Sequence, residues 1–411
     1  MGGDRGLRHR NTFRRRLVTT EDSAGDRALA TRLAHAGRNI ARQEGSVNPP
    51  IHRGSTILVE RAEDLYAANA RTYGLGGHQV HEALRGALCE LENASHCLLV
   101  ESGLLACTLP IFALVGAGEH ILVPDNSYGP TRRYCERSLK RTGGTVTYYQ
   151  PDIGEGISAL IRSNTRLVMI ESPGSLTFET PDTRAIVAAS RRHGVITALD
   201  NCWASGVHLK PLDLGVDMSI LATTKYVGGH SDSLSGAVLL RDKALAQRLQ
   251  DASTDLGLCM APEDASLILR GLRTLDLRMR QHEESALQIA SWLQKRPEVL
   301  QVLHPALPDD PGHALWKRDF TGSSGLFGFA LAPCDDSAVM AFLNGLQLFG
   351  LGFSYGGYES LAINCDPQIG RREKKPDLGG PLIRLAVGLE DAGDLIADLE
   401  RGLKAWTAAR S

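Results

Sequence analysis

Lys225 is the residue of this sequence whose surroundings best suit it for covalent chemistry. It follows an apolar run typical of a buried strand, within Leu221-Ala-Thr-Thr-Lys-Tyr-Val-Gly-Gly-His-Ser-Asp232. Burial disfavours the charged ammonium and lowers the pKa of a lysine, so that its neutral amine can attack a carbonyl and form a Schiff base. A lysine after a strand is more often an ordinary surface residue, so other groups must support this interpretation.

Three other predicted strand ends supply groups that would complete such a site. Asp200 closes the run 195–200, where its carboxylate could pair with the ring nitrogen of pyridoxal phosphate and keep the ring an electron sink. The run 97–101 leads into Ser102-Gly103-Leu104 and a helix, whose free N–H groups and positive end favour a phosphate. Tyr128 follows another strand, and its ring could stack on the cofactor. Each feature alone is more often a helix cap or a surface residue, but the combination predicts a pyridoxal-phosphate site.

The elements that must position these groups are short apolar runs that alternate with amphipathic segments. In the segment 81–92, for example, Leu84, Leu88 and Leu91 lie on one helical face. This alternation predicts an α/β domain with a mainly parallel sheet, helices on both faces, and ligands at the carboxyl ends of the strands. The predicted strands are 97–101, 121–124, 145–149, 167–171, 195–200, 220–223 and 236–240.

The pattern changes after residue 240 and predicts a smaller α+β domain. Its expected elements are a helical stretch from 262 towards 294, helices near 337–346 and 391–405, and strands at 326–331 and 382–387. The chain is therefore expected to consist of an N-terminal arm with a helix or two (1–77), a cofactor-binding α/β domain (78–270) and a C-terminal α+β domain (271–411).

The composition is that of a soluble globular protein. Hydrophobic residues make up 43% of the 411 residues, charged residues 22%, and the net charge is −2. This balance excludes a largely disordered chain and offers no basic field for nucleic acid, and no apolar run is long enough to cross a membrane. The eight scattered cysteines have neither zinc nor thioredoxin-like spacing, which predicts a cytoplasmic protein without a metal site. The six arginines of residues 5–16 predict a solvated arm.

Several sequence blocks identify a family. They are Gly45-Ser-Val-Asn48, Cys89-Glu-Leu-Glu92, Glu171-Ser-Pro-Gly-Ser175, Asp200-Asn-Cys-Trp-Ala204, Gly356-Gly-Tyr-Glu-Ser-Leu361, Leu382-Ile-Arg-Leu385 and Gly388-Leu-Glu-Asp391. In these blocks, their order and their approximate spacing, the chain resembles the Cys/Met-metabolism family of pyridoxal-phosphate enzymes from about residue 45 to 403. That family includes cystathionine β-lyases, γ-lyases and γ-synthases, and the resemblance is greatest to the bacterial β-lyases.

The resemblance implies a fold, a cofactor and an assembly. The implied fold is the aspartate-aminotransferase-like arrangement of fold type I enzymes, with a mainly parallel sheet domain and a smaller C-terminal α+β domain. The implied cofactor is pyridoxal 5'-phosphate, and the implied partner is a small amino-acid substrate, with no nucleic acid and no membrane. The implied assembly is a homotetramer of dimers that share active sites.

Matched residue by residue, the resemblance also implies roles around the cofactor. Lys225 forms the Schiff base and then carries the proton, Asp200 pairs with the ring nitrogen, and Tyr128 stacks on the ring. The expected phosphate donors are the backbone of Gly103 and Leu104 and the hydroxyl of Thr224, with Ser175 near the cofactor hydroxyl.

The implied substrate contacts lie further along the chain. Arg384 clamps the α-carboxylate through two parallel hydrogen bonds, for which its planar guanidinium is suited. Ser354 assists Arg384, and Tyr355 follows it where the family has a tryptophan. Tyr73 is matched to a catalytic tyrosine that reaches the active site of the neighbouring subunit.

The chain departs from the family at the cofactor phosphate and around the far end of the substrate. Leu75 stands where the family normally has an arginine that donates to the cofactor phosphate across the dimer interface, and Gly76 stands where the β-lyases often have an arginine. Arg133, preceded by Arg132, stands where the β-lyases have an acidic residue. These two arginines could meet an anionic group of the substrate, although an exposed helical pair explains them equally well.

The sequence therefore predicts a pyridoxal-phosphate-dependent lyase or transferase of sulfur amino acid metabolism. A carbon–sulfur β-lyase, acting through aldimine and carbanion chemistry, is favoured. The alternative is a γ-replacement or carbon–carbon bond-forming enzyme with a γ-activated donor such as S-adenosylmethionine or an O-acylhomoserine. A cofactor-binding protein that has lost catalysis is the second alternative, against which Lys225, Asp200 and Arg384 argue together.

Overall fold

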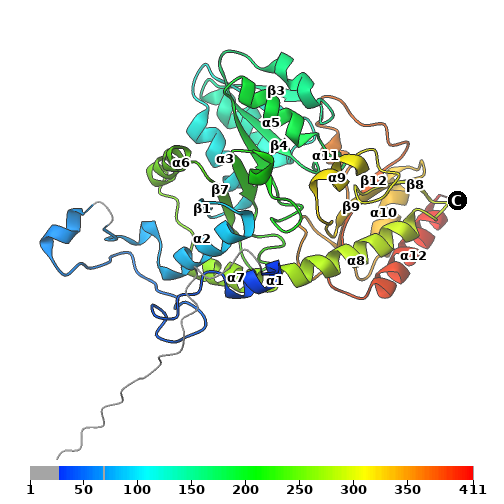
Figure 1. The fold of residues 1–411 in the computed structure, drawn as a ribbon. Helices are drawn as coiled ribbons and strands as arrows, with labels where there is room; N and C mark the ends of the chain where they lie inside the picture. The colour runs from blue at the N-terminus through cyan, green and yellow to red at the C-terminus, as the bar shows by residue number, and fades with distance from the viewer. Residues whose placement is uncertain (1–26, 68–69, 411) are drawn as a thin grey trace, which may run out of the picture.

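The computed structural model of the chain describes residues 27–67 and 70–410. Two sheets with their covering helices form the body, from which part of the N-terminal segment projects (Figure 1). The solvated arm expected for residues 5–16 lies outside the described residues. In the described part of the chain, no helix has both the length and the hydropathy that crossing a membrane requires.

The larger sheet has seven strands among the described residues, in the order β1-β7-β6-β5-β4-β2-β3. All neighbouring strands are parallel except that β7 runs antiparallel to both β1 and β6. The predicted mainly parallel sheet is thus confirmed, and each strand lies within two residues of its predicted limits. The strands are β1 (His96–Val100), β2 (His120–Pro124), β3 (Thr145–Tyr149), β4 (Thr165–Glu171), β5 (Ile196–Asp200), β6 (Met218–Leu221) and β7 (Gly236–Leu240).

Both faces of this sheet are buried. Along β2, Ile121 and Val123 pack into one apolar cluster, whereas Leu122 packs into another on the opposite face. Side chains of a strand alternate between the faces, so a strand that is apolar at consecutive positions needs helices on both sides. The helices of this domain are α2 (Gln79–Glu92), α3 (Gly103–Leu114), α4 (Gly129–Tyr134), α5 (Thr183–Arg192) and α6 (Lys243–Asp255).

The second sheet has the order β10-β11-β12-β9-β8 and belongs to the C-terminal part of the chain. Its strands are antiparallel neighbours except for β10 and β11. The predicted strands at 326–331 and 382–387 correspond to β9 and β12. The elements are β8 (Val299–Leu303), β9 (Leu326–Leu331), β10 (Gly350–Leu351), β11 (Leu361–Asn364), β12 (Leu382–Ala386), α9 (His313–Asp319), α10 (Asp336–Gly345), α11 (Asp366–Ile369) and α12 (Ala392–Ala409).

The helical stretch expected at 262–294 is divided into α7 (Pro262–Leu272) and α8 (Leu275–Leu293). At the division, Arg273 Nη1 donates to the carbonyl of Leu33 over 2.9 Å, which ties the junction to α1 (Leu29–His35). From there α8 runs beneath both domains towards α12 (Figure 1). The limits of the three predicted domains remain a prediction, with α8 the element that bridges the second and third.

The N-terminal segment carries little regular structure. In its described residues, 27–67 and 70–77, the helical elements besides α1 are two 3₁₀ turns, Ala62–Tyr66 and Gly74–Gly76. Several of its large apolar side chains are exposed in this single chain, including Leu58, Tyr66 and Tyr73. Exposed apolar side chains of this number on a projecting segment are typical of a surface that packs against another chain.

Candidate active site

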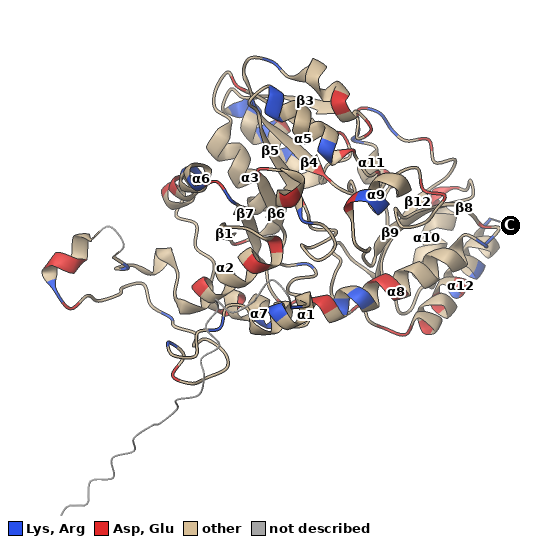
Figure 2. Ribbon diagram, in the orientation of Figure 1, with Lys and Arg blue, Asp and Glu red and all other residues tan. Residues whose placement is uncertain are grey.

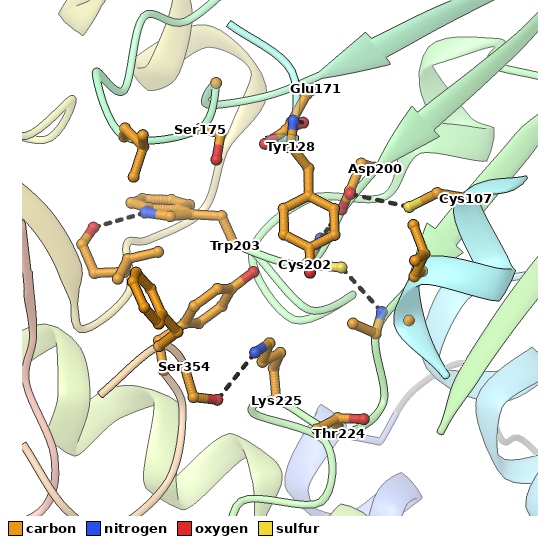
Figure 3. Close-up of a pocket in the computed structure, with 18 of the residues that line it drawn as sticks. Cys107, Tyr128, Glu171, Ser175, Asp200, Cys202, Trp203, Thr224, Lys225 and Ser354 are labelled. Carbon is orange, nitrogen blue, oxygen red and sulfur yellow. Dashed lines mark hydrogen bonds between the residues drawn. The ribbon is translucent and has the colours of Figure 1, made fainter. Parts of the chain in front are cut away.

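A cavity of about 250 Å³ lies at the carboxyl edge of the large sheet, where it meets the small domain (Figure 3). β4, β5 and β6 end at this edge because they are parallel, and β1 ends there too because β7 runs antiparallel to both β1 and β6. Ten of the predicted site residues line the cavity: Gly103, Leu104, Tyr128, Ser175, Asp200, Thr224, Lys225, Ser354, Tyr355 and Arg384.

Lys225 extends from the loop after β6 into this cavity. Its Nζ donates to Ser354 Oγ over 2.9 Å and lies 4.9 Å from the centre of the Tyr355 ring. Burial lowers the pKa of Lys225, and the nearby charge of Arg384 lowers it further. A lysine held in this way has an amine that is more readily deprotonated than that of a surface lysine, as a Schiff-base nucleophile requires.

The loop that carries Lys225 is held in position by the buried arginine Arg278. Arg278 of α8 donates to the carbonyls of Tyr226 and Val227 over 2.6 and 3.2 Å, and to that of Gly271 over 2.8 Å. Gly271 has no room for a side chain, since a Cβ there would lie 2.1 Å from the carbonyl oxygen of Gly228. The close approach of α7 and the guanidinium of Arg278 together hold the loop in one position.

Asp200 ends β5 and is buried against the cavity. Its Oδ1 accepts from the backbone N–H of Cys202 over 3.0 Å, and its Oδ2 accepts from Cys107 Sγ over 3.5 Å. No lysine or arginine forms an ion pair with it among the described residues, and burial raises the pKa of this carboxyl. A buried carboxylate without a cation is unfavourable, so the site suits a ligand that brings a positive N–H to this position.

Tyr128 stands across the cavity from Lys225, just before α4 (Figure 3). Tyr128 is 40% exposed, and its backbone N–H donates to Glu171 Oε2 over 2.7 Å. Glu171 ends β4 beside Asp200; burial, and then the charge of Asp200, raises its pKa. Glu171 therefore fixes the backbone that presents the tyrosine ring to the cavity.

The N-terminus of α3 forms the end of the cavity suited to a phosphate. Ser102 caps the helix, with Oγ accepting from the N–H of Leu105 over 3.1 Å, which leaves the N–H groups of Gly103 and Leu104 without partners inside the helix. A Cβ on Gly103 would lie 2.4 Å from that of Ala222, so only glycine allows this approach. Thr224 Oγ1 donates to the Ser235 carbonyl over 3.0 Å, so this hydroxyl must turn to serve as the predicted phosphate donor.

Arg384 projects from β12 into the opposite wall of the cavity. Its Nη2 donates to the carbonyl of Ser354 over 3.1 Å, while its Nε is buried without a hydrogen-bond partner. An unpaired buried guanidinium N–H is unfavourable, and a carboxylate is the group whose geometry matches it best. Ser354 thus contacts Lys225 through its hydroxyl and Arg384 through its carbonyl.

Two predicted site residues are not part of this cavity. Tyr73 is 59% exposed on the N-terminal segment, and Arg133 is exposed on α4. The neighbouring Arg132 is buried instead, ion-paired with Asp125 over 2.8 Å and with Glu136 over 2.9 Å. Of the two arginines considered for an anionic group, Arg132 is therefore held in buried ion pairs, and Arg133 is exposed and does not line the cavity.

The structure adds residues to which no role was assigned from the sequence. Cys107 and Cys202 contact Asp200, Glu171 supports Tyr128, and Trp203 Nε1 donates to the carbonyl of Leu326 over 2.8 Å across the two domains. That Glu171 lies beside Asp200 could have been inferred, because the two residues end neighbouring strands. The contact of Arg278 with the Lys225 loop could not, because Arg278 lies on a helix more than fifty residues further along the chain. The cavity as a whole fits pyridoxal phosphate, with a lysine, an unpaired carboxylate and a free helix N-terminus around it.

Comparison with known proteins agrees with this geometry. Residues 30–404 match the family described as Cys/Met metabolism PLP-dependent enzyme. A putative cystathionine beta-lyase of Rhizobium johnstonii is 49% identical over 385 residues, which cover 92% of this chain and 97% of that protein. Cystathionine beta-lyase MetC of Escherichia coli is 41% identical over 389 residues, covering 92% and 98%. Among solved structures, the cystathionine gamma synthase of Xanthomonas oryzae in complex with cystathionine is similar, with a TM-score of 0.87, 34% identity, and coverage of 93% of this chain and 99% of that one.

Proposed function

Because the chain belongs to the Cys/Met-metabolism family of pyridoxal-phosphate-dependent enzymes, we propose that it is a carbon–sulfur β-lyase that cleaves cystathionine or a similar amino acid. The family makes it a PLP-dependent enzyme of sulfur amino acid metabolism. The observation that carries the proposal is the position of Lys225, Asp200 and Arg384 around one cavity, with a free helix N-terminus at its end.

We assign the cofactor contacts as follows. The N–H groups of Gly103 and Leu104 hold the phosphate, with the hydroxyl of Thr224 beside them. Asp200 would hold a proton on the ring nitrogen, Tyr128 would stack on the ring, and Ser175 would lie near the ring hydroxyl. When bound, pyridoxal phosphate supplies an electron sink that stabilises negative charge at the substrate Cα.

The remaining residues of the cavity position the substrate and move protons. Arg384 binds the α-carboxylate through Nε and an Nη, which places the Cα–H bond near Lys225. The Nζ of Lys225 accepts the Cα proton, and Ser354 Oγ orients this amine through the bond of 2.9 Å. The Cβ–S bond then breaks, its electron pair leaves with sulfur, and Lys225 donates the proton to that sulfur. For cystathionine the balance is cystathionine and water in, homocysteine, pyruvate and ammonia out.

The alternative is γ-replacement, or carbon–carbon bond formation, with a γ-activated donor. It is supported by the likeness to a cystathionine gamma synthase and by Arg133, which stands where the β-lyases have an acidic residue near the far end of the substrate. Ser175 and the block 356–361 favour the β-lyase, because they match the β-lyase pattern. The non-catalytic alternative is disfavoured by Lys225 and Arg384, whose amine and Nε both face the cavity.

We further propose a homotetramer of dimers in which Tyr73 reaches the active site of the neighbouring subunit. The exposure of Tyr73, Leu58 and Tyr66 on the projecting segment supports this assembly. The absence of disulfides among the eight cysteines, all within the described residues, supports action in the cytoplasm. Sedimentation of the holoenzyme tests the assembly, and a mass of one chain would contradict it.

A substrate panel tests the reaction. The purified holoenzyme is incubated in turn with cystathionine, cystine, an O-acylhomoserine with cysteine, and S-adenosylmethionine, and the products are separated by mass. A β-lyase forms pyruvate from cystathionine and leaves the γ-activated donors unchanged. Product formation from a γ-activated donor alone would establish the alternative.

A further inference from the structure

Two cysteines hold the carboxylate of Asp200, one at each of its oxygens (Figure 3). Oδ1 accepts from the backbone N–H of Cys202 over 3.0 Å, and Oδ2 accepts from the thiol of Cys107 over 3.5 Å. The first bond comes from the turn that directly follows β5. The second comes from a side chain of α3, more than ninety residues earlier in the chain, so it depends on the identity of residue 107.

The thiol of Cys107 is the donor in this contact. Burial, and then the charge of Asp200, raises the pKa of Cys107, so its sulfur keeps the proton. Burial also raises the pKa of Asp200, whereas its hydrogen bonds with Cys202 and Cys107 act in the opposite direction. An ionised carboxylate can only accept hydrogen bonds, and a donor at its oxygen stabilises the charged form. The S–H group therefore favours the ionised Asp200.

The helix that carries Cys107 is otherwise apolar in character. α3 has neither acidic nor basic residues along its length (Figure 2), and Cys107 belongs to the apolar cluster between this helix and the sheet. A cysteine in such a cluster is most often a small hydrophobe. Cys135 is that case, because it is buried in the same cluster and does not line the cavity. Cys107 differs in lining the cavity and in its bond to a buried carboxylate.

The position of Cys107 on α3 relates the two ends of the cofactor site. The N–H groups of Gly103 and Leu104, which we assign to the phosphate, belong to the first turn of this helix, and Cys107 lies one turn further along. One helix thus presents donors to the phosphate and, through its thiol, to the carboxylate of Asp200. The separation of the phosphate site from the carboxylate is therefore set by contacts of α3.

We propose that Cys107 is a positioning residue of the cofactor site, whose thiol keeps the carboxylate of Asp200 ionised and directed at the ring nitrogen. The inference rests on the proposed function insofar as pyridoxal phosphate binds with its ring nitrogen at Asp200. Cys107 then acts on the cofactor through Asp200 alone, since a proton on the ring nitrogen needs an ionised partner. The strength of the electron sink depends on that proton, so a neutral thiol of α3 contributes to it.

The test separates the hydrogen bond from packing with two substitutions and two cofactors. Cys107→Ser keeps a donor but is more polar, whereas Cys107→Val keeps an apolar side chain but has no donor. The full-length apoenzymes are reconstituted with pyridoxal phosphate, and with its analogue in which a CH group replaces the ring nitrogen. Dissociation constants are measured by quenching of tryptophan fluorescence, for which Trp203 lines the cavity. Cys135→Ser and Cys135→Val are the matched controls.

Cys107→Val is expected to weaken pyridoxal phosphate about fivefold, because a weak donor to a charged group is lost, and Cys107→Ser should bind it like the wild type. The analogue lacks the group that Asp200 faces, so neither substitution should change its binding, and the Cys135 variants should change neither compound.

Three results would overturn the positioning role. They are unchanged binding of pyridoxal phosphate by Cys107→Val, equal weakening of both compounds by it, and weakening by Cys107→Ser alone, which would indicate packing. No substrate is involved, so these results leave the proposed reaction untouched. Failure of the wild type to bind pyridoxal phosphate would instead reject the proposed function, and the role of Cys107 with it.

Discussion

The side chain of Lys225 is held by Ser354, whose hydroxyl accepts from Nζ over 2.9 Å. The backbone carbonyl of the same serine accepts a hydrogen bond from Arg384 Nη2 over 3.1 Å. One residue of the small domain thus sets the position of the proposed base, on the large domain, and of the proposed carboxylate clamp. Chemistry at Cα depends on the distance between these two groups, so Ser354 couples domain packing to catalysis.

Ser354→Ala should lower kcat about tenfold with little change in KM, because it removes one hydrogen bond to a charged group and keeps the backbone carbonyl that contacts Arg384. Steady-state kinetics and the visible absorption of the bound cofactor are the measurements. Ser337→Ala, on the distant helix α10, is the matched control. An unchanged kcat in Ser354→Ala would show that this serine does not position the amine.

Arg384→Lys should raise KM about tenfold or more while the cofactor stays bound, because an ammonium cannot supply two parallel hydrogen bonds to a carboxylate. Substrate titration of the holoenzyme tests this. Arg401→Lys changes a guanidinium of α12 outside the cavity and should leave KM unaltered. If Arg384→Lys instead released the cofactor with KM unchanged, Arg384 would be a cofactor ligand and the substrate orientation would be wrong.

Glu92 makes stability depend on pH. It is fully buried in α2, its Oε1 accepts from Asn201 over 2.8 Å, and burial raises its pKa from 4.5 to about 7. Between pH 4.5 and about pH 7 this carboxyl is protonated in the folded protein but ionised in the unfolded chain. The free energy of unfolding therefore falls as pH rises through this range and stays low above it.

Glu92→Gln removes that dependence. Its free energy of unfolding should exceed that of the wild type by up to about 3 kcal/mol near pH 8, and the two should converge below about pH 5. Urea unfolding of both proteins at several pH values measures this, with Glu284→Gln, on the exposed face of α8, as the control. If Glu92→Gln raised the free energy of unfolding by the same amount at about pH 5 and at pH 8, the assignment to a titrating carboxyl would be contradicted.

Leu75→Arg should tighten pyridoxal phosphate about tenfold, because it restores a cation that can donate to the phosphate across a subunit boundary. The dissociation constant of the cofactor, measured by fluorescence during reconstitution of the apoenzyme, is the readout. Leu300→Arg adds the same charge at an exposed leucine of β8 and should not change it. Equal tightening by both variants would point to a general charge effect.

The strands and the central site residues could be predicted because their signals are local. Each strand is a continuous apolar run, and Asp200, Lys225 and Gly103 stand at the ends of such runs. β8, β10 and β11 were missed because they are short or half exposed, and their pairing with β9 and β12 is set by the sheet rather than by their own residues.

The rest of the site depends on contacts between distant segments. Arg278 of α8 donates to carbonyls of the Lys225 loop. The carboxylate of Asp125 accepts hydrogen bonds from the backbone N–H groups of Glu373 and Lys374, which belong to the other domain. The division between α7 and α8 has the same origin, because Arg273 is engaged by α1. Such partners have no periodicity in the sequence, and only the folded chain brings them together.

The central claim is that Lys225 moves the Cα proton in a β-elimination. Its most direct test is the rate of pyruvate formation from cystathionine by the wild type and by Lys225→Ala, both loaded with pyridoxal phosphate and checked for bound cofactor. The account predicts pyruvate and homocysteine in equal amounts from the wild type, and neither from Lys225→Ala. Pyruvate at the wild-type rate from Lys225→Ala, or cysteine and 2-oxobutanoate from the wild type, would contradict it.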